Sequence, residues 1–222
     1  MTPRPLRKDA ELNRDRLLEA ARELFAKRGL GVGLNEIARR AGVGVGTAYR
    51  HFPDKEQLID TLFEQRLCEI VALASEALGD PDAWRGLGFF LDRWLRLHLH
   101  DRGLTQVFTN PELGPRRVGK SRDRIAPLLD AIADRAREQG HTRPDFRGTD
   151  VFFIQLTLAG LMDRSLELSP DLYRRYLAMI LDGARARPDL AADLPVSALT
   201  VDQTHAVMTS RGQAGAKRSA QP

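Results

Sequence analysis

Residues 33–55 read GLNEIARRAGVGVGTAYRHFPDK, and this stretch decides the fold. Two very short helical patterns flank a turn rich in glycine, with Ile37 facing inward on the first pattern and Ala48 on the second. Gly42 stands where a tight turn between two crossing helices needs a residue that can adopt positive φ. The stretch therefore predicts a helix-turn-helix over residues 33–52, whose second helix enters the major groove of DNA.

Hydrogen-bond donors crowd the second short helix and the residues after it. They are hydroxyl, phenol, guanidinium, imidazole and ammonium groups, on Thr47, Tyr49, Arg50, His51 and Lys55. Such groups suit phosphate contacts, which position a protein on DNA, and base contacts, which read its sequence. Solvated charges would explain Arg50 or Lys55 alone, and a structural role would explain His51 alone. Their combination within one motif favours a DNA-binding surface.

Almost every other segment with a clear hydrophobic repeat has the period of an α-helix. These segments are residues 13–28, 54–78, 83–99, 103–108, 121–139, 149–166 and 170–186. No run shows strand alternation bounded by hairpin turns. The sequence therefore predicts an all-α fold, with a three-helix DNA-binding head, a linking fourth helix and about five helices behind it.

The expected domain organisation follows from these segments. Residues 10–57 form the helix-turn-helix domain, with Asp54 as a plausible cap of the fourth helix, and residues 58–186 form a larger helical domain. Residues 1–9 form a flexible basic arm. Residues 187–222 lose periodicity and are rich in small and polar residues, so we expect most of them to form a disordered tail.

The composition is that of a soluble globular protein, because 42% of the 222 residues are hydrophobic and 29% are charged. Lys and Arg outnumber Asp and Glu by 34 to 30, so a basic surface must arise from local clustering. The single cysteine, Cys68, excludes an intrachain disulfide, and we expect it to be a small core residue in a reducing compartment. No stretch approaches the ~18 apolar residues of a membrane span, and the charged start of the chain is unlike a signal peptide. These features predict a cytoplasmic protein.

Residues 17–62 resemble the DNA-binding domain of the TetR (TetR/AcrR) family of transcriptional regulators. The matching pieces lie in one register and are AARELFA at 20–26, Gly29, EIA at 36–38, AGV at 41–43, GTAY at 46–49 and HFPDKE at 51–56. The resemblance implies that phosphates are held by Thr47, Tyr49, His51 and Lys55. It also implies base-edge contacts by Asn35, Val45 and Arg50.

Two glycines depart from the family pattern. Gly33 and Gly44 stand where a Ser or Thr usually caps each short helix. A glycine cap lacks the side-chain hydrogen bond, which costs about a few tenths of a kcal/mol, and it also removes a possible phosphate contact. Val45 can touch a thymine methyl group but cannot read a donor–acceptor pattern, so base reading is expected to depend on Arg50, Asn35 and the arm.

The resemblance further implies a homodimer that binds double-stranded DNA at a near-palindromic operator. The helix from Thr149 is apolar in nearly every direction and needs a partner on its outer side. The expected dimer interface over 149–186 comprises Phe152, Leu156, Tyr173, Leu177 and Ile180. The expected effector pocket comprises Phe90, Trp94, Phe108 and Gln155. By family analogy, a small, largely apolar molecule enters this pocket, shifts the fourth helix and releases a repressor from DNA, although activation stays an alternative.

Other classes of function fit the sequence less well. An enzyme would need a nucleophile, a base or a metal cluster, and no such constellation surrounds any of the five histidines, so we expect no catalytic residue, metal or cofactor. His98 and His100 are two apart, on nearly opposite sides of a helix, and residues 42–46 form G-x-G-x-G without a preceding strand. An α-helical protein-interaction module remains as an alternative, but it leaves the donors of residues 47–55 unexplained.

Overall fold

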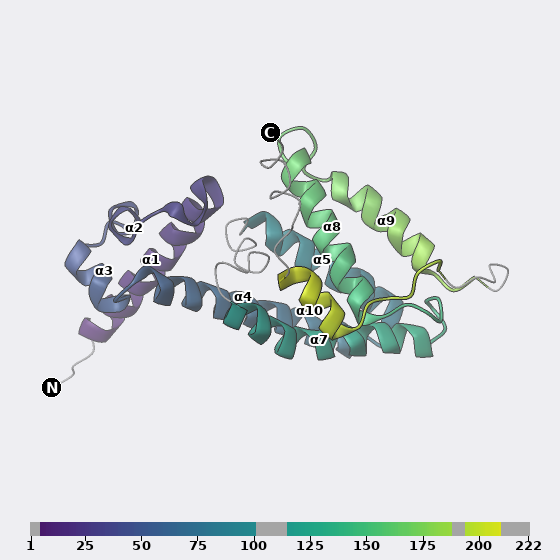
Figure 1. The fold of residues 1–222 in the computed structure, drawn as a ribbon. Coiled ribbons are helices and arrows are strands. Elements are labelled where there is room, and N and C mark those ends of the chain that lie inside the picture. Colours follow the sequence, from purple (N-terminus) through teal and green to yellow (C-terminus); the bar gives the residue numbers. More distant parts are fainter. Residues whose placement is uncertain (1–4, 101–114, 188–193, 210–222) are drawn as a thin grey trace, which may run out of the picture.

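The computed structural model describes residues 5–100, 115–187 and 194–209 of the 222 (Figure 1). Within these ranges the regular elements are helices, and the one extended feature is an isolated antiparallel bridge between Thr142 and Arg185. The all-α prediction is confirmed. Among the described helices, none is both long and apolar enough to span a membrane.

The head consists of α1 (Pro5–Arg28), the short 3-10 helix η1 (Gly29–Gly31), α2 (Leu34–Ala41) and α3 (Val45–His51). Its core is apolar and closely packed: Phe25, Ile37 and Ala48 are at most 1% exposed. Gly42 ends α2 with φ of 65°, in the left-handed region that only glycine adopts readily. The predicted turn between the two short helices is therefore confirmed.

The first helix begins earlier than expected. Residues 5–9 belong to α1, whereas we predicted a flexible arm over residues 1–9. Pro5 occupies the first helical position, where its missing N–H costs nothing. The residues after it, LRKDAEL, contain no helix breaker, so the helix continues smoothly into its amphipathic part.

A long helix, α4 (Lys55–Gly79), links the head to the body, which comprises α5 and α7–α10 (Figure 1). The carboxylate of Asp54 accepts a hydrogen bond of 2.8 Å from the N–H of Gln57, which confirms the predicted cap. The inward face of α4 carries buried residues such as Leu62 and Leu67. Cys68 lies on the opposite face and is exposed, so our expectation of a core cysteine was wrong.

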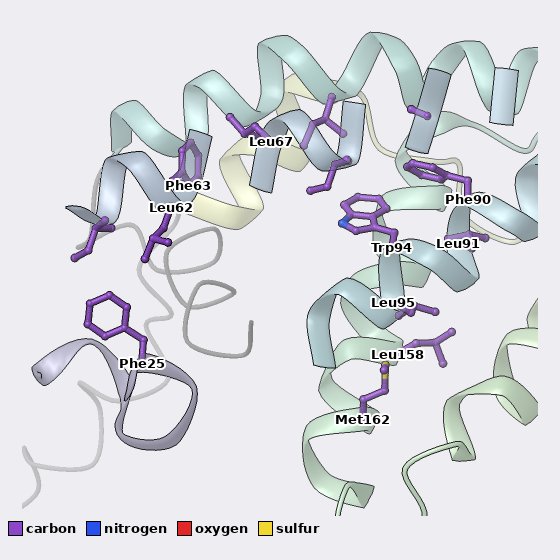
Figure 2. Close-up of a cluster of buried hydrophobic side chains, with 14 of the residues drawn as sticks. Phe25, Leu62, Phe63, Leu67, Phe90, Leu91, Trp94, Leu95, Leu158 and Met162 are labelled. Carbon is purple, nitrogen blue, oxygen red and sulfur yellow. The ribbon is translucent and has the colours of Figure 1, made fainter. Parts of the chain in front are cut away.

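The body is a set of packed helices: α5 (Ala83–His100), α7 (Pro115–Glu138), α8 (Gly148–Ser165) and α9 (Leu172–Ala184). Helix α4 packs against α5 and α7, α7 packs against α8, and α8 packs against α9. Figure 2 shows part of the shared core, in which Leu95 of α5 lies beside Leu158 and Met162 of α8. The rings of Phe90 and Trp94 lie 5.2 Å apart at 47°.

The start of α8 differs from the sequence prediction. The sequence repeat predicted a helix from residue 149, but α8 begins at Gly148 and the carboxylate of Asp150 accepts a hydrogen bond from the N–H of Arg147. The Thr149 hydroxyl instead donates to the carbonyl of Leu199, 2.9 Å away. Thr149 therefore binds a later part of the chain rather than its own helix end.

That later part is a ninth α-helix of the described ranges, α10 (Val201–Thr209), which packs against α7. It lies within the stretch that we predicted to be a disordered tail, so that prediction was wrong for residues 201–209. Thr200 and Gln203 cap it reciprocally, each side chain accepting from the other residue's N–H. Nearby, Asp145 accepts from the N–H of Leu194, and its ion pair with Arg143 holds its pKa at about 2.

Candidate nucleic-acid interface

The outer face of α3 presents side chains to solvent at the exposed end of the head. Val45 is 43% exposed and Tyr49 is 45% exposed, although both are large apolar or aromatic groups. Arg50 is exposed beside them, whereas Ala48 is fully buried against the head. A seven-residue helix that buries its small residue and exposes its large ones is suited to insertion into a groove.

The Arg50 guanidinium is oriented by its own helix. Its Nη2 donates a 3.0 Å hydrogen bond to the hydroxyl of Thr47, one turn earlier. The contact restricts the long Arg50 side chain and uses only one of its nitrogens, so the other N–H donors stay available. Thr47 thus contacts Arg50 directly, which the sequence alone did not indicate.

The ammonium of Lys55 is held by a residue that sequence reasoning missed. Its Nζ donates to the carbonyl oxygen of Leu30, 2.7 Å away in η1. A lysine ammonium has three donors, so two of them stay available for a phosphate. No sequence pattern signals this contact, because it joins a backbone carbonyl to a side chain 25 positions away.

The first helix of the motif is braced against α1 by two ion pairs. Arg28 pairs with Glu36, and Arg40 pairs with Glu23. Arg40 thus pairs with α1 while its side chain stays partly exposed. Asn35 is exposed on α2 and makes no side-chain hydrogen bond within the described residues, so it is available for a base contact.

The two glycine caps lack any side-chain hydrogen bond, as their residue type requires. A Cβ added at Gly33 would meet nothing within 4 Å, and one added at Gly44 would meet only the Thr47 hydroxyl at 3.9 Å. Both positions therefore have room for the serine that the family pattern usually holds.

We expect Gly44→Ser to raise operator affinity, by up to about tenfold, because its hydroxyl can bond a phosphate. The free energy of unfolding should change by only about a few tenths of a kcal/mol, since the cap replaces glycine. Fluorescence anisotropy on operator DNA and a thermal melt measure the two effects. Gly44→Ala is the matched control: it fills the same space without a hydroxyl, and an equal gain in this variant would exclude the phosphate contact.

The expected pocket residues lie on two helices that pack together, α5 and α8. Phe90 is fully buried and Trp94 is 7% exposed, and their rings are in contact. Gln155 is 9% exposed on the inward face of α8, among apolar neighbours such as Leu158. Phe108 lies outside the described residues.

The expected dimer residues divide into two groups. Phe152, Leu156 and Ile180 are half-buried and accessible in part. Tyr173 and Leu177 are buried in their own subunit, and the Tyr173 hydroxyl donates to Asp92 of α5 at 3.1 Å. The burial arises because α9 turns these two residues toward α5 and α8.

The outer face of α9 carries large side chains that are not among the expected dimer residues. Tyr176 is 41% exposed and Met179 is 58% exposed, and they lie three residues apart on one side of the helix. With Tyr173 and Leu177 directed inward, position 179 falls on the outer side of the helix and position 176 lies at the edge of the inward face.

The comparisons with known proteins cover both the head and most of the chain. Residues 17–62 match the family model described as bacterial regulatory proteins, tetR family. The TetR transcription regulatory protein from Mycobacterium vanbaalenii is 32% identical, with a TM-score of 0.59, over 82% of this chain and 99% of that one. A TetR transcriptional regulator from Streptomyces coelicolor is 30% identical, with a TM-score of 0.60, over 78% and 98%. An HTH-type transcriptional regulator from Staphylococcus aureus is 27% identical over 180 residues, which are 79% of this chain and 95% of its own.

Proposed function

The chain belongs to the TetR family of transcriptional regulators, and from that premise we propose that it is a homodimeric repressor, which a small, largely apolar effector releases from a near-palindromic operator. One observation carries the DNA-binding part of this proposal: α3 exposes Val45, Tyr49 and Arg50 on its outer face, and Thr47 orients the Arg50 guanidinium. The effector then acts by favouring a different state.

The proposed roles in DNA binding follow from the placement of each side chain. Arg50, Asn35 and Val45 are exposed at the outer surface of the motif and suit contacts with base edges. Phosphates are assigned to Thr47, Tyr49, His51 and Lys55. Residues 10–57 act as the DNA-binding domain, and residues 58–186 act as the effector-binding and dimerisation domain.

We propose that two subunits pair through α8 and α9, which lie side by side (Figure 1). The outer face of α9 exposes Tyr176 and Met179, and α8 adds the half-buried Phe152 and Leu156. Large apolar groups gathered on neighbouring helices are typical of an interface. A two-fold axis there would place two heads on successive major grooves, about 34 Å or a multiple of it apart.

We expect Met179→Asp to convert the dimer into monomers, because it places two unpaired charges at a buried interface. Light scattering of the purified protein measures the mass, and operator affinity should fall steeply, because a monomer binds one half-site only. Val196→Asp is a matched control, since Val196 is 75% exposed outside these helices. A Met179→Asp protein that stays dimeric would place the interface elsewhere.

The proposed effector site lies between α5 and α8, beside the aromatic pair Phe90 and Trp94. The lining is apolar, and the buried amide of Gln155 supplies a polar group, which suits a largely apolar molecule with one hydrogen-bonding function. Helix α4 packs against α5, so a ligand that displaces α5 also displaces α4 and the head. Release requires the ligand to bind the displaced state more tightly than the operator-competent one.

A reporter gene placed behind the chain's own operator distinguishes repression from activation. Repression predicts low reporter output when the chain is present and high output when it is absent, with Arg50→Ala behaving like absence. Output that rises with the intact chain would establish an activator. Output that ignores the chain, together with no DNA binding in vitro, would favour a protein-interaction module.

A further inference from the structure

The middle of α4 carries polar side chains that contact the head on one side and the body on the other. Toward the head, Arg14 of α1 lies 3.5 Å from the hydroxyl of Thr61, and Arg22 donates to the amide oxygen of Gln65 at 2.8 Å. These contacts occur within two turns of α4, next to the point where the head joins the body. A displacement of this segment therefore moves the head.

Toward the body, Glu64 binds two cations of α7. Lys120 donates to its Oε1 at 3.0 Å and Arg124 donates to its Oε2 at 2.8 Å, so both oxygens of the carboxylate are used. Arg124 also places its Nη2 3.6 Å from the sulfur of Cys68, one turn further along α4. We call Glu64, Lys120 and Arg124 the Glu64 cluster.

The joint between α1 and α4 is open at this level rather than closely packed. A surface hollow of about 650 Å³ lies there, lined by Arg14, Arg22, Asp60, Thr61, Glu64, Gln65, Cys68 and Glu69. Where side chains do not interlock, hydrogen bonds and ion pairs determine how two helices are spaced. The Glu64 cluster is therefore placed to influence the direction of α4.

The same turn of α7 is also held from another side. Arg122 lies between the two cations of the Glu64 cluster, and its Nη1 is 3.2 Å from a carboxylate oxygen of Asp202 in α10. Helix α10 thus contacts the turn of α7 that binds α4. Helix α10, which the sequence did not predict, therefore supports the same turn of α7 that pairs with Glu64 of α4.

We propose that Glu64 is a positioning residue, which through Lys120 and Arg124 holds α4, and with it the head, in the operator-competent direction. The inference rests on the proposed function for its consequence in DNA binding. Helix α4 links the head to the body, and Glu64 is its ion-paired contact with α7 beside the contacts with α1. An effector that displaces α7 or α4 must break or stretch the cluster.

The expected size of the effect follows from exposure. The side chains of Glu64 and Arg124 are 41% and 38% exposed, so the pairs are screened by solvent and contribute little to overall stability. Such weak pairs can still decide the direction of α4 if the operator-competent and displaced directions differ only slightly in free energy. Loss of the cluster should weaken operator binding about two- to fivefold, the range that exposed ion pairs support.

The experiment measures the distance between head and body within one subunit. Cysteines at Lys27 in α1 and at Glu138 in α7, in a Cys68→Ser background, carry a fluorescent donor and acceptor; both positions are exposed. Excess unlabelled protein suppresses transfer between subunits. Glu64→Gln removes the charge but keeps the shape, and Glu76→Gln, on an exposed residue of the same helix, is the matched control.

Glu64→Gln is expected to broaden the donor–acceptor distance distribution and to weaken operator binding about two- to fivefold. Glu76→Gln should leave the distribution and the operator affinity unchanged. High salt should broaden the parent distribution toward that of Glu64→Gln. The charge-reversed pair Glu64→Arg with Arg124→Glu should restore the parent behaviour that Glu64→Arg alone loses.

The proposal is overturned if the Glu64→Gln distribution matches the parent, or if it broadens while operator affinity stays the same. Equal effects of Glu64→Gln and Glu76→Gln would also overturn it, because they would reflect general charge on α4. A parent protein that binds no operator would refute the proposed function instead. In that case the distance measurement still decides whether Glu64 directs α4.

Discussion

Arg50→Ala is expected to lower operator affinity by about 1–3 kcal/mol per subunit and to relax base preference at one position of each half-site. Arg50 is exposed at the outer face of α3, and its hydrogen bond to Thr47 directs the guanidinium before DNA binds. A guanidinium that forms two parallel hydrogen bonds to a guanine cannot be replaced by a methyl group. Competition binding against operators that are mutated at single positions measures the loss of preference.

Lys55→Ala is the matched comparison for Arg50→Ala, because we assign Lys55 to a phosphate and Arg50 to a base. A phosphate contact is blind to sequence, so Lys55→Ala should weaken binding to all duplexes alike and reduce the salt dependence of affinity by about one phosphate. Lys55 also bonds the carbonyl of Leu30, so a thermal melt must accompany the binding assay. If Arg50→Ala and Lys55→Ala weaken specific and non-specific binding in the same proportion, Arg50 is not a base-reading residue.

Gly148→Ala is expected to destabilise the body by about 3 kcal/mol and to lower the melting midpoint by about 6–12 °C. An added Cβ would lie 2.3 Å from the carboxylate of Asp130, 2.5 Å from its backbone nitrogen and 2.8 Å from its Cα. Two of these atoms are backbone, so α7 and α8 must separate to relieve the overlap. Burial raises the pKa of the Asp130 carboxyl, which agrees with a close crossing of the two helices.

Gly119→Ala is the control for this substitution. Gly119 lies in α7 itself, and a Cβ there would meet nothing within 4 Å. Alanine should be neutral or stabilise the helix by up to about 1 kcal/mol, because it reduces the entropy that the unfolded chain loses. If Gly148→Ala and Gly119→Ala lose similar stability, position 148 needs glycine for its flexibility and not because α7 and α8 cross closely there.

The head could be predicted from the sequence because its determinants are local. Gly42 at the turn, small residues such as Ala38 and Ala48 at the crossing, and the Asp54 cap act within a few residues of their positions. Local spacing therefore indicated the helix-turn-helix, although α1 begins earlier than expected. In the structure, the burial of Ala48 leaves Val45 and Tyr49 on the exposed face of α3.

The other features could not be predicted from the sequence, because they depend on contacts between distant parts of the chain. Lys55 donates to a carbonyl in η1, Tyr173 donates to Asp92, and Glu64 accepts from a lysine of α7. The local hydrophobic repeat does not predict any of these contacts. Tyr173 and Leu177, two of the expected dimer residues, are buried in their own subunit. A helix that is apolar on several sides does not reveal which side faces its own subunit.

The last helix is a different case, because a local signal did exist. Thr200 followed by Gln203 is a capping box, which marks a helix start. The apolar positions after it are too few and too weakly periodic to predict nine helical residues on their own. Packing against α7 supplies the stability that the sequence of α10 lacks.

The most direct test of the central claim is selection from a random duplex pool, with affinities then measured by fluorescence anisotropy at two salt concentrations. Our account predicts enrichment of a near-palindromic sequence, bound as a dimer, with an affinity that falls steeply as salt rises. Weak, uniform binding without enrichment would contradict operator recognition by the effector-free protein. It would leave either a regulator that needs its ligand in order to bind DNA or a protein whose helical surfaces serve another partner.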